Sequence, residues 1–184
     1  EILKIEFIKS KSQYLIHKSI NSLDIYKHLT GKNNDYTLIH LDEKWFTRLY
    51  IQSFSEIAPT KDQFIIFIKT FLETKNHNLF ITTGLIKIDL LDQLIVNFFT
   101  KVYENFYVYK FNEYKVYLYT GASIEDLEVL TMNSKNLITC NGPLTQIAIS
   151  FRIPVIDILE KDLEKWYDRH IHNKETYIKL YRKP

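Results

Sequence analysis

Apolar positions along this chain fall into short continuous runs that alternate with longer stretches of helical spacing. The short runs are rich in β-branched and aromatic residues and predict strands at 36–41, 78–83, 136–140 and 154–159. Helical spacing follows Thr60, covers 90–99, follows Ser123 and covers 144–151. Strands separated by helices of about 10–15 residues form βαβ units. The pattern therefore predicts an α/β fold with a Rossmann-like parallel sheet flanked by helices.

Three further segments carry weaker signals. Residues 103–119 are aromatic and partly alternating, which predicts one or two strands, whereas the charged and aromatic segment 160–182 is expected to be largely helical. The start of the chain does not follow the alternation; 18–31 has the pattern of a helix that ends at a glycine. We place a domain boundary in the polar stretch 31–34.

Two helix starts have recognisable caps. Thr60 and Gln63 have the form of a capping box, in which each side chain binds the other residue's backbone N–H. Ser123 is a suitable N-cap, with Asp126 three residues further on.

Composition excludes several classes of protein. The 184 residues carry 24 Lys and Arg against 22 Asp and Glu, a net charge of +2, which does not predict nucleic-acid binding. A single cysteine excludes an internal disulfide. No run approaches the ~18 apolar residues of a membrane-spanning helix, and no signal peptide is visible. Because the chain begins with Glu1, we expect it to be a piece of a longer protein.

Three of the four glycines stand at equivalent places. Gly84, Gly121 and Gly142 each follow a predicted strand and precede a predicted helix. In a parallel sheet these junctions share the carboxyl edge, where open α/β sheets bind ligands. Glycine allows positive φ or close approach of a ligand, although each glycine could simply turn the chain.

The segment 141–145 is the sharpest of these junctions. A proline in the first helical turn leaves no unpaired N–H, and the N–H groups after it, with the helix dipole, favour an anion such as a diphosphate. Thr145 could add a hydroxyl, and Lys44, after the first strand, could add a positive charge. Neither a P-loop nor a dinucleotide fingerprint is present. The alternative for Lys44 is a solvated loop.

Over residues 36–160 the chain resembles the C-terminal, nucleotide-sugar-binding half of glycosyltransferase family 9, the heptosyltransferase-like enzymes. The family has a Lys with a nearby Trp after a strand, as in Lys44-Trp45, and a strand that ends in a small-residue turn, as in 82–84. Segment 121–127 matches its Gly-to-helix junction. Segment 137–159 has the frame of its most specific motif, a strand, Asp-Thr-Gly-Pro, a hydrophobic residue and His, a helix, and a Pro-led strand.

The chain also departs from the family. Cys140, Asn141 and Thr145 replace the Asp, Thr and His of that motif, and Leu85-Ile86 stands where an acidic ribose ligand is often found. A degenerate site is therefore an alternative: a non-catalytic Rossmann-like binding module. A third hypothesis is a flavodoxin-like domain used for protein contacts.

The resemblance implies the C-terminal half of a GT-B fold. Residues 1–35 would be the end of a missing N-terminal domain and the connection, 36–160 the donor-binding domain, and 161–184 a helical tail. The reaction would be metal-independent, with no cofactor and a nucleoside diphosphate sugar as donor. The catalytic base would lie on the N-terminal domain, outside this chain. The acceptor would be a glycan or lipid-linked sugar in bacterial polysaccharide or lipopolysaccharide synthesis, which implies a cytoplasmic protein with peripheral association at the inner face of the membrane.

The resemblance also implies site residues. Phosphates would be held by Lys44, Ser123, the turn of Asn141, Gly142 and Pro143, and Thr145. The nucleotide pocket would be lined by Thr82, Thr83, Gly84 and Gly121, with Glu125 as a weaker candidate for the ribose or base.

Two other candidates are set aside. His170 and His172 are a close pair, but they lie in the expected helical tail without converging acidic or cysteine ligands, so we expect no metal site. Cys140 follows an apolar strand and is expected to be buried and inert.

Overall fold

The computed structural model describes Ile25, Leu29, and residues 35–46, 57–169, 171 and 175–182. The boundary at 31–34, most of the helix expected over 18–31, and both histidines of the 170/172 pair lie outside these residues.

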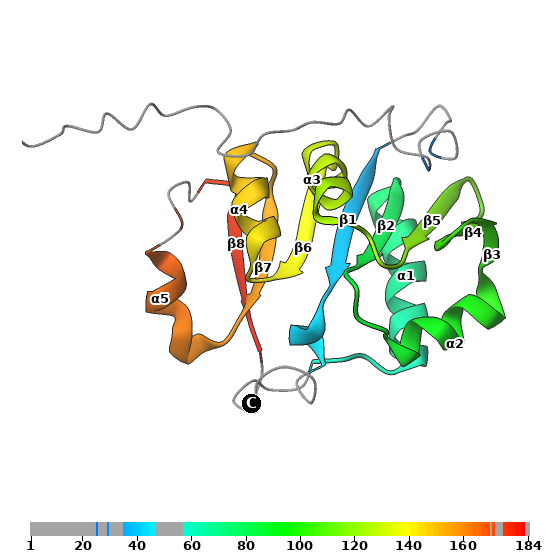
Figure 1. Cartoon of the computed structure of the whole chain (residues 1–184), viewed down its shortest axis with the longest axis horizontal. Coiled ribbons are helices and arrows are strands. Elements are labelled where there is room, and N and C mark those ends of the chain that lie inside the picture. Colours follow the sequence, from blue (N-terminus) through cyan, green and yellow to red (C-terminus); the bar gives the residue numbers. More distant parts are fainter. Residues whose placement is uncertain are drawn as a thin grey trace, which may run out of the picture.

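One sheet organises the described part of the chain. Its eight strands have the order β3-β4-β5-β2-β1-β6-β7-β8 (Figure 1). The strands are β1 (Tyr36–Leu41), β2 (Asn78–Thr83), β3 (Thr100–Tyr103), β4 (Phe106–Phe111), β5 (Tyr114–Tyr119), β6 (Asn136–Cys140), β7 (Val155–Leu159) and β8 (Tyr177–Tyr181). The six strands from β5 to β8 are parallel, and a β3–β4 hairpin is added antiparallel to β5. The expected α/β fold with a mainly parallel, Rossmann-like sheet is confirmed.

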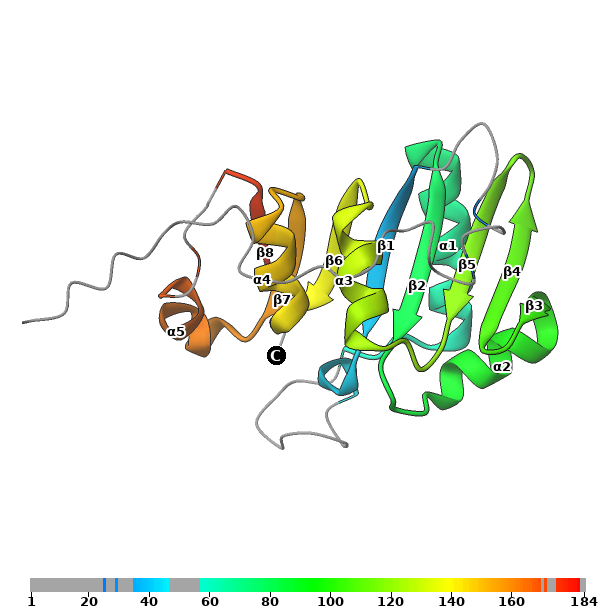
Figure 2. The ribbon, with the colours of Figure 1, turned by 45° about the horizontal axis from the view of Figure 1, so that its top comes forward.

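Helices cover both faces of the sheet. The helices α1 (Lys61–Lys75) and α2 (Asp89–Phe98) pack on one face, and α3 (Ile124–Met132) and α4 (Pro143–Ser150) on the other (Figure 2). Short helical turns η3 (Glu43–Trp45), η5 (Lys161–Leu163) and α5 (Glu164–Asp168) follow β1 and β7. Among the described helices, none has both the length and the apolar character that a membrane span requires.

The central strands are buried on both sides because both faces of the sheet are covered. Along β1, Leu38 belongs to the core beneath α3 and α4, whereas Ile39 and Leu41 belong to the core beneath α1 and α2. All six residues of β1 are buried. This explains why the sequence shows continuous apolar runs there.

Both predicted helix caps are confirmed. The Thr60 hydroxyl accepts from the Gln63 N–H, and the Gln63 side chain accepts from the Thr60 N–H. The Ser123 hydroxyl accepts from the Asp126 N–H at 3.2 Å. These caps satisfy donors that a helix start leaves without an intrahelical partner.

The prediction of a helical tail is wrong for its last part. Residues 177–181 form β8, which pairs in parallel with β7 and so extends the sheet beyond residue 160. Aromatic and aliphatic residues separated by one lysine give this segment strand propensity, and the exposed edge of β7 supplies hydrogen-bond partners. Strand β3 was also not predicted; β4 and β5 lie within 103–119, where one or two strands were expected.

Candidate functional site

The order in which the chain adds strands to the sheet reverses between β1 and β6. The chain continues from β1 through α1 to β2 on one side, whereas from β6 it continues through α4 to β7 on the other. Helices α1 and α4 cover opposite faces. The loops after β1 and β6 therefore diverge, and such a switch point is where open α/β sheets form a ligand crevice.

Lys44 and the turn at Gly142 meet at this point; we call Lys44, Asn141 and Gly142 the junction site. The Lys44 ammonium donates to the carbonyl oxygen of Asn141 and lies 3.4 Å from Oδ2 of Asp42. A Cβ on Gly142 would lie 2.9 Å from Lys44 Nζ. The missing Cβ of Gly142 thus leaves room for the ammonium at this position. Backbone conformation does not require glycine here, since a φ of 177° is extended backbone that any residue adopts.

The junction site combines the Lys44 ammonium, which is paired with Asp42, with the N-terminus of α4. Gly142 is the N-cap of this helix and makes no side-chain cap, and Pro143 occupies the first turn. The positive end of the helix dipole therefore faces the same space as the Lys44 ammonium. The Lys44 side chain is 17% exposed, so an anion could reach it. A cation beside a helix N-terminus is suited to phosphate.

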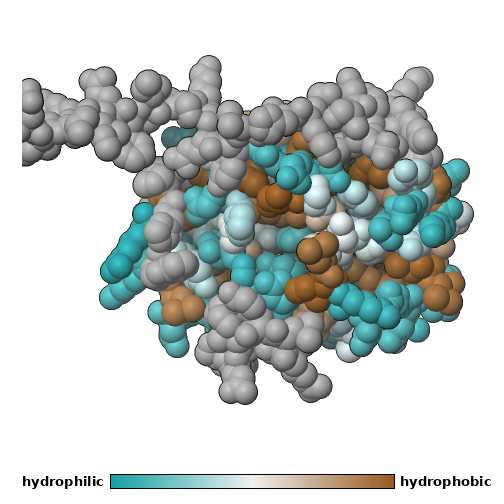
Figure 3. Space-filling view, in the orientation of Figure 1, coloured by the Kyte–Doolittle hydropathy of each residue, from teal (hydrophilic) through white to brown (hydrophobic). Residues whose placement is uncertain are grey.

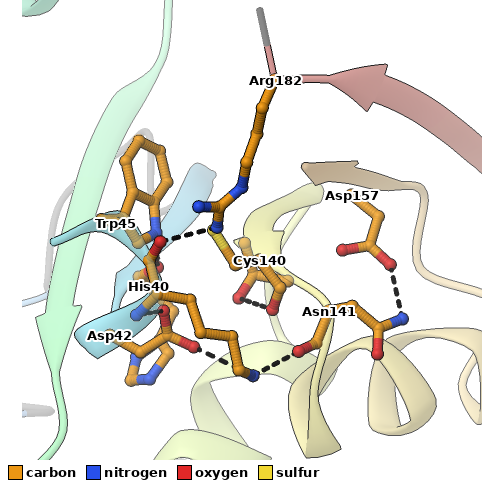
Figure 4. Close-up of polar contacts among 9 residues, drawn as sticks. His40, Asp42, Trp45, Cys140, Asn141, Asp157 and Arg182 are labelled. Atoms are coloured by element: carbon orange, nitrogen blue, oxygen red, sulfur yellow. Dashed lines mark hydrogen bonds and ion pairs between the residues drawn. The ribbon is translucent and has the colours of Figure 1, made fainter. Parts of the chain in front are cut away.

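A buried carboxylate supports the turn from behind. Asp157 on β7 is fully buried, and its Oδ2 accepts from the Asn141 side-chain amide at 3.1 Å (Figure 4). The same oxygen accepts from the Tyr177 hydroxyl at 2.8 Å. Burial raises the pKa of Asp157 to about 6, against the opposing effects of these hydrogen bonds and of Lys44. Asp157 thereby fixes the side chain of Asn141.

Arg182, near the C-terminal end of the described chain, contacts the loop that carries Lys44. The guanidinium of Arg182, which follows β8, donates to the carbonyl oxygen of Lys44 at 2.6 Å and lies 3.3 Å from Sγ of Cys140. The Trp45 indole N–H donates to the carbonyl oxygen of His40 at 3.1 Å. Cys140 is buried, as expected, and burial raises the pKa of its thiol to about 12, which predicts low reactivity.

A cavity of about 300 Å³ lies at the same edge of the sheet, after β2 and β5. It is lined by Thr83, Gly84, Leu85, Ile86, Lys87, Ile88, Leu91, Asp92, Ile95, Asn105, Tyr107, Thr120 and Gly121. The Thr83 hydroxyl accepts from the Gly121 N–H and donates to the Gly84 carbonyl, both at 3.1 Å. This side chain therefore ties the two glycine turns together.

Figure 3 shows hydrophilic and hydrophobic residues interspersed on the described part of the face seen in Figure 1.

The predicted site residues divide into two groups. Lys44, Asn141, Gly142 and Pro143 come together at the β1–β6 junction, and Thr83, Gly84 and Gly121 line the cavity. All three glycine turns follow parallel strands and lie at one edge of the sheet, as predicted.

The remaining predicted residues are placed differently. Thr82 and Thr145 are fully buried; Thr82 Oγ1 is hydrogen-bonded to His40 Nδ1 at 3.1 Å, and Thr145 lies behind the turn beside Asp157. Neither hydroxyl is exposed at the edge of the sheet where a ligand would bind. Ser123 uses its hydroxyl to cap α3, and Glu125 is exposed in the first turn of that helix; neither lines the cavity.

Sequence reasoning missed Asp157, Tyr177 and Arg182. Asp157 carried a usable signal, because it is a charged residue in a strand that is otherwise apolar. Tyr177 and Arg182 carried none, since they belong to a segment expected to be helical. Within the described residues, no group of three or more His, Cys, Asp or Glu side chains is arranged to hold a metal ion.

Comparison of the chain with protein-family models, with curated proteins and with solved structures gave no match.

Proposed function

We propose that this chain is the donor-binding half of a glycosyltransferase similar to family 9, which transfers a sugar from a nucleoside diphosphate sugar. One observation carries the proposal: Lys44 from the β1 loop meets the N-terminus of α4 at the switch point of a parallel sheet. The resemblance adds a glycan or lipid-linked acceptor in bacterial polysaccharide synthesis, at the inner face of the membrane.

The diphosphate would bind at the junction site. Its oxygens would replace the Asn141 carbonyl and the Asp42 carboxylate as partners of the Lys44 ammonium. As the bond to the sugar breaks, negative charge develops on the departing nucleoside diphosphate. The ammonium and the α4 dipole would stabilise this charge from fixed positions, which is electrostatic catalysis. The base that activates the acceptor would be supplied by the N-terminal domain.

The nucleoside would occupy the cavity after β2 and β5. From β5 to β6 there are three strand intervals, or roughly 14 Å at the usual spacing of about 4.8 Å. A nucleoside in the cavity can thus extend its diphosphate along the edge toward Lys44. The turns at Gly84 and Gly121 would offer backbone groups to the ribose or the base.

A non-catalytic binding module is the second candidate. Lys44 already has two partners, Asp42 and Asn141, and the family's Asp, Thr and His are replaced by Cys140, Asn141 and Thr145. A ligand must therefore compete for the ammonium. A chain of this kind would keep the fold and bind another phosphorylated ligand, or none.

Calorimetric titration of the chain with UDP, ADP, GDP and CDP, and then with their sugar derivatives, tests the proposal. We expect saturable binding of one nucleotide and about tenfold or greater weakening in Lys44→Ala, because a charge-assisted contact to phosphate is lost. Lys135→Ala is the matched control, since Lys135 is an exposed lysine paired with Asp35 at the opposite edge of the sheet.

The outcomes separate the two candidates. A folded chain that binds none of the four nucleotides contradicts the transferase proposal and favours the module. Binding that is equally strong in Lys44→Ala would remove Lys44 from the site and, with it, the observation on which the proposal rests.

A further inference from the structure

Arg182 brings a buried positive charge from the last described strand to the junction site. Its side chain is 2% exposed and extends from the end of β8 toward Cys140 and the loop after β1 (Figure 4). Strands β6 and β7 separate β8 from β1 in the sheet. The side chain therefore connects two segments that the sheet itself does not pair.

The hydrogen bonds of Arg182 hold the backbone of Lys44 in place. Arg182 Nη2 donates to the Lys44 carbonyl oxygen at 2.6 Å, while the Lys44 N–H donates to Oδ1 of Asp42 at 3.0 Å. Both backbone polar groups of Lys44 are thus bound by side chains. With the backbone fixed at both groups, only the side-chain torsions of Lys44 remain to be set.

Burial makes this arrangement costly unless the guanidinium is well paired. Glu160 Oε1 lies 3.8 Å from Arg182 Nε, and Cys140 Sγ lies 3.3 Å from Nη2. The backbone N–H of Arg182 donates to the Leu159 carbonyl at 3.0 Å, which fixes the root of the side chain. The planar, five-donor fork of arginine can serve several acceptors at once, which a lysine ammonium cannot do in the same geometry.

We infer that Arg182 is a positioning residue for Lys44: by holding the Lys44 carbonyl, it directs the Lys44 ammonium to the Gly142 turn and makes β8 part of the donor site. The inference rests on the proposed function for its role in nucleotide binding. The orientation of Lys44 is a separate, measurable consequence.

A second lysine on the same strand provides the matched control. Lys179 binds Glu164 at 2.6 Å and Asp168 at 2.7 Å, and so ties β8 to α5 without a contact to Lys44. Lys179→Ala should loosen the packing of β8 against α5 while leaving the Arg182–Lys44 hydrogen bond in place. A general effect of the strand is therefore separable from a specific effect of Arg182.

The first test does not depend on a nucleotide. Lys44 is acetylated with a limiting amount of acetic anhydride and quantified by peptide mass spectrometry, well below the melting temperature of each variant. We expect roughly tenfold faster acetylation of Lys44 in Arg182→Ala, because the ammonium is released from its partners, and no change in Lys179→Ala. Arg182→Lys should give a smaller increase, and it decides the question if Arg182→Ala does not fold. Unchanged labelling in a folded Arg182 variant overturns the inference.

The second test is a double-mutant cycle on nucleotide affinity. If Arg182 acts through Lys44, the variant with both Lys44→Ala and Arg182→Ala should bind no more weakly than Lys44→Ala alone. Independent, additive losses would overturn the positioning role. Absence of nucleotide binding in the wild-type chain would contradict the proposed function, whereas the labelling result would still decide whether Arg182 positions Lys44.

Discussion

The carboxyl edge of the sheet has two regions built from the same strand–turn–helix unit but with opposite character. At the β1–β6 junction, Lys44 is held by Asp42 and Asn141, and a Cβ on Gly142 would meet the ammonium. After β2 and β5 there is instead a cavity of about 300 Å³, and a Cβ on Gly84 or Gly121 would meet nothing within 4 Å. A glycine after a strand therefore has no single structural role. Here one glycine permits a close contact between side chain and backbone, while another permits a left-handed turn.

The largest expected effect concerns the carboxylate behind the junction site. Because burial raises the pKa of Asp157 from 3.8 to about 6, the folded chain binds this proton more tightly than the unfolded chain. Relative to Asp157→Asn, the free energy of unfolding of the wild-type chain should fall by up to about 3 kcal/mol as the pH rises through this window, and then stay level. Urea denaturation of both proteins from about pH 4 to pH 7 measures this difference.

Subtracting the variant isolates Asp157 from other titrating groups. His40, whose pKa burial lowers to about 4, contributes stability that is lost as the pH falls, but it is present in both proteins. Parallel pH profiles for the two proteins would show that Asp157 is ionised at its ordinary pKa and that the junction is more hydrated than its packing indicates.

The next effect tests the close contact at Gly142. In Gly142→Ala the added Cβ displaces the flexible end of Lys44, so we expect about tenfold weaker nucleotide binding, as in Lys44→Ala, with little change in stability. Calorimetry and urea denaturation measure the two quantities. Gly84→Ala is the control for stability, because its Cβ meets no atom. Full affinity in Gly142→Ala would show that Lys44 does not act from its present position.

A smaller effect is expected on the cavity side. Gly121 has a φ of +66°, in the left-handed region, so Gly121→Ala should lower the free energy of unfolding by about 1 kcal/mol through backbone strain. Gly84→Ala, without positive φ, should be neutral or slightly stabilising. Equal effects of the two substitutions in urea denaturation would contradict the assignment of strain to Gly121.

The smallest effect concerns the charge beside Lys44. Asp42→Asn keeps an oxygen that can accept from the Lys44 N–H but removes the negative charge 3.4 Å from the ammonium. Diphosphate binding should therefore tighten a few-fold, an effect of the size expected for a partly exposed ion pair. Asp35→Asn, at the amino edge, should leave affinity unchanged in the same calorimetric titration. Weaker binding in Asp42→Asn would indicate that Asp42 orients Lys44 by its charge.

Local patterns in the sequence were sufficient to predict most strands of the sheet and the edge at which its glycine turns lie. Continuous apolar runs predicted β1, β2, β6 and β7, since strands buried on both faces need no alternation. Thr60 and Ser123 predicted helix starts, because a cap depends on residues three positions apart. The shared edge of the three glycine turns followed from parallel topology alone. These features depend on residues that are close in the sequence, so a local reading of the sequence can predict them.

Only the tertiary structure decided which side chains meet at that edge. Lys44 and Asn141 are 97 positions apart, and Lys44 and Arg182 are 138 apart, so no local pattern relates them. Thr82 and Thr145 were predicted as ligands, but the packing of both faces of the sheet buries them. Strand β8 was predicted to be helical although its own residues favour a strand, because the edge of β7 with which it pairs forms only in the assembled sheet. Hydrogen bonds across the sheet and the burial of charge are properties of the assembled fold, and they place Asp157 and Arg182 behind the turn that the sequence had already indicated.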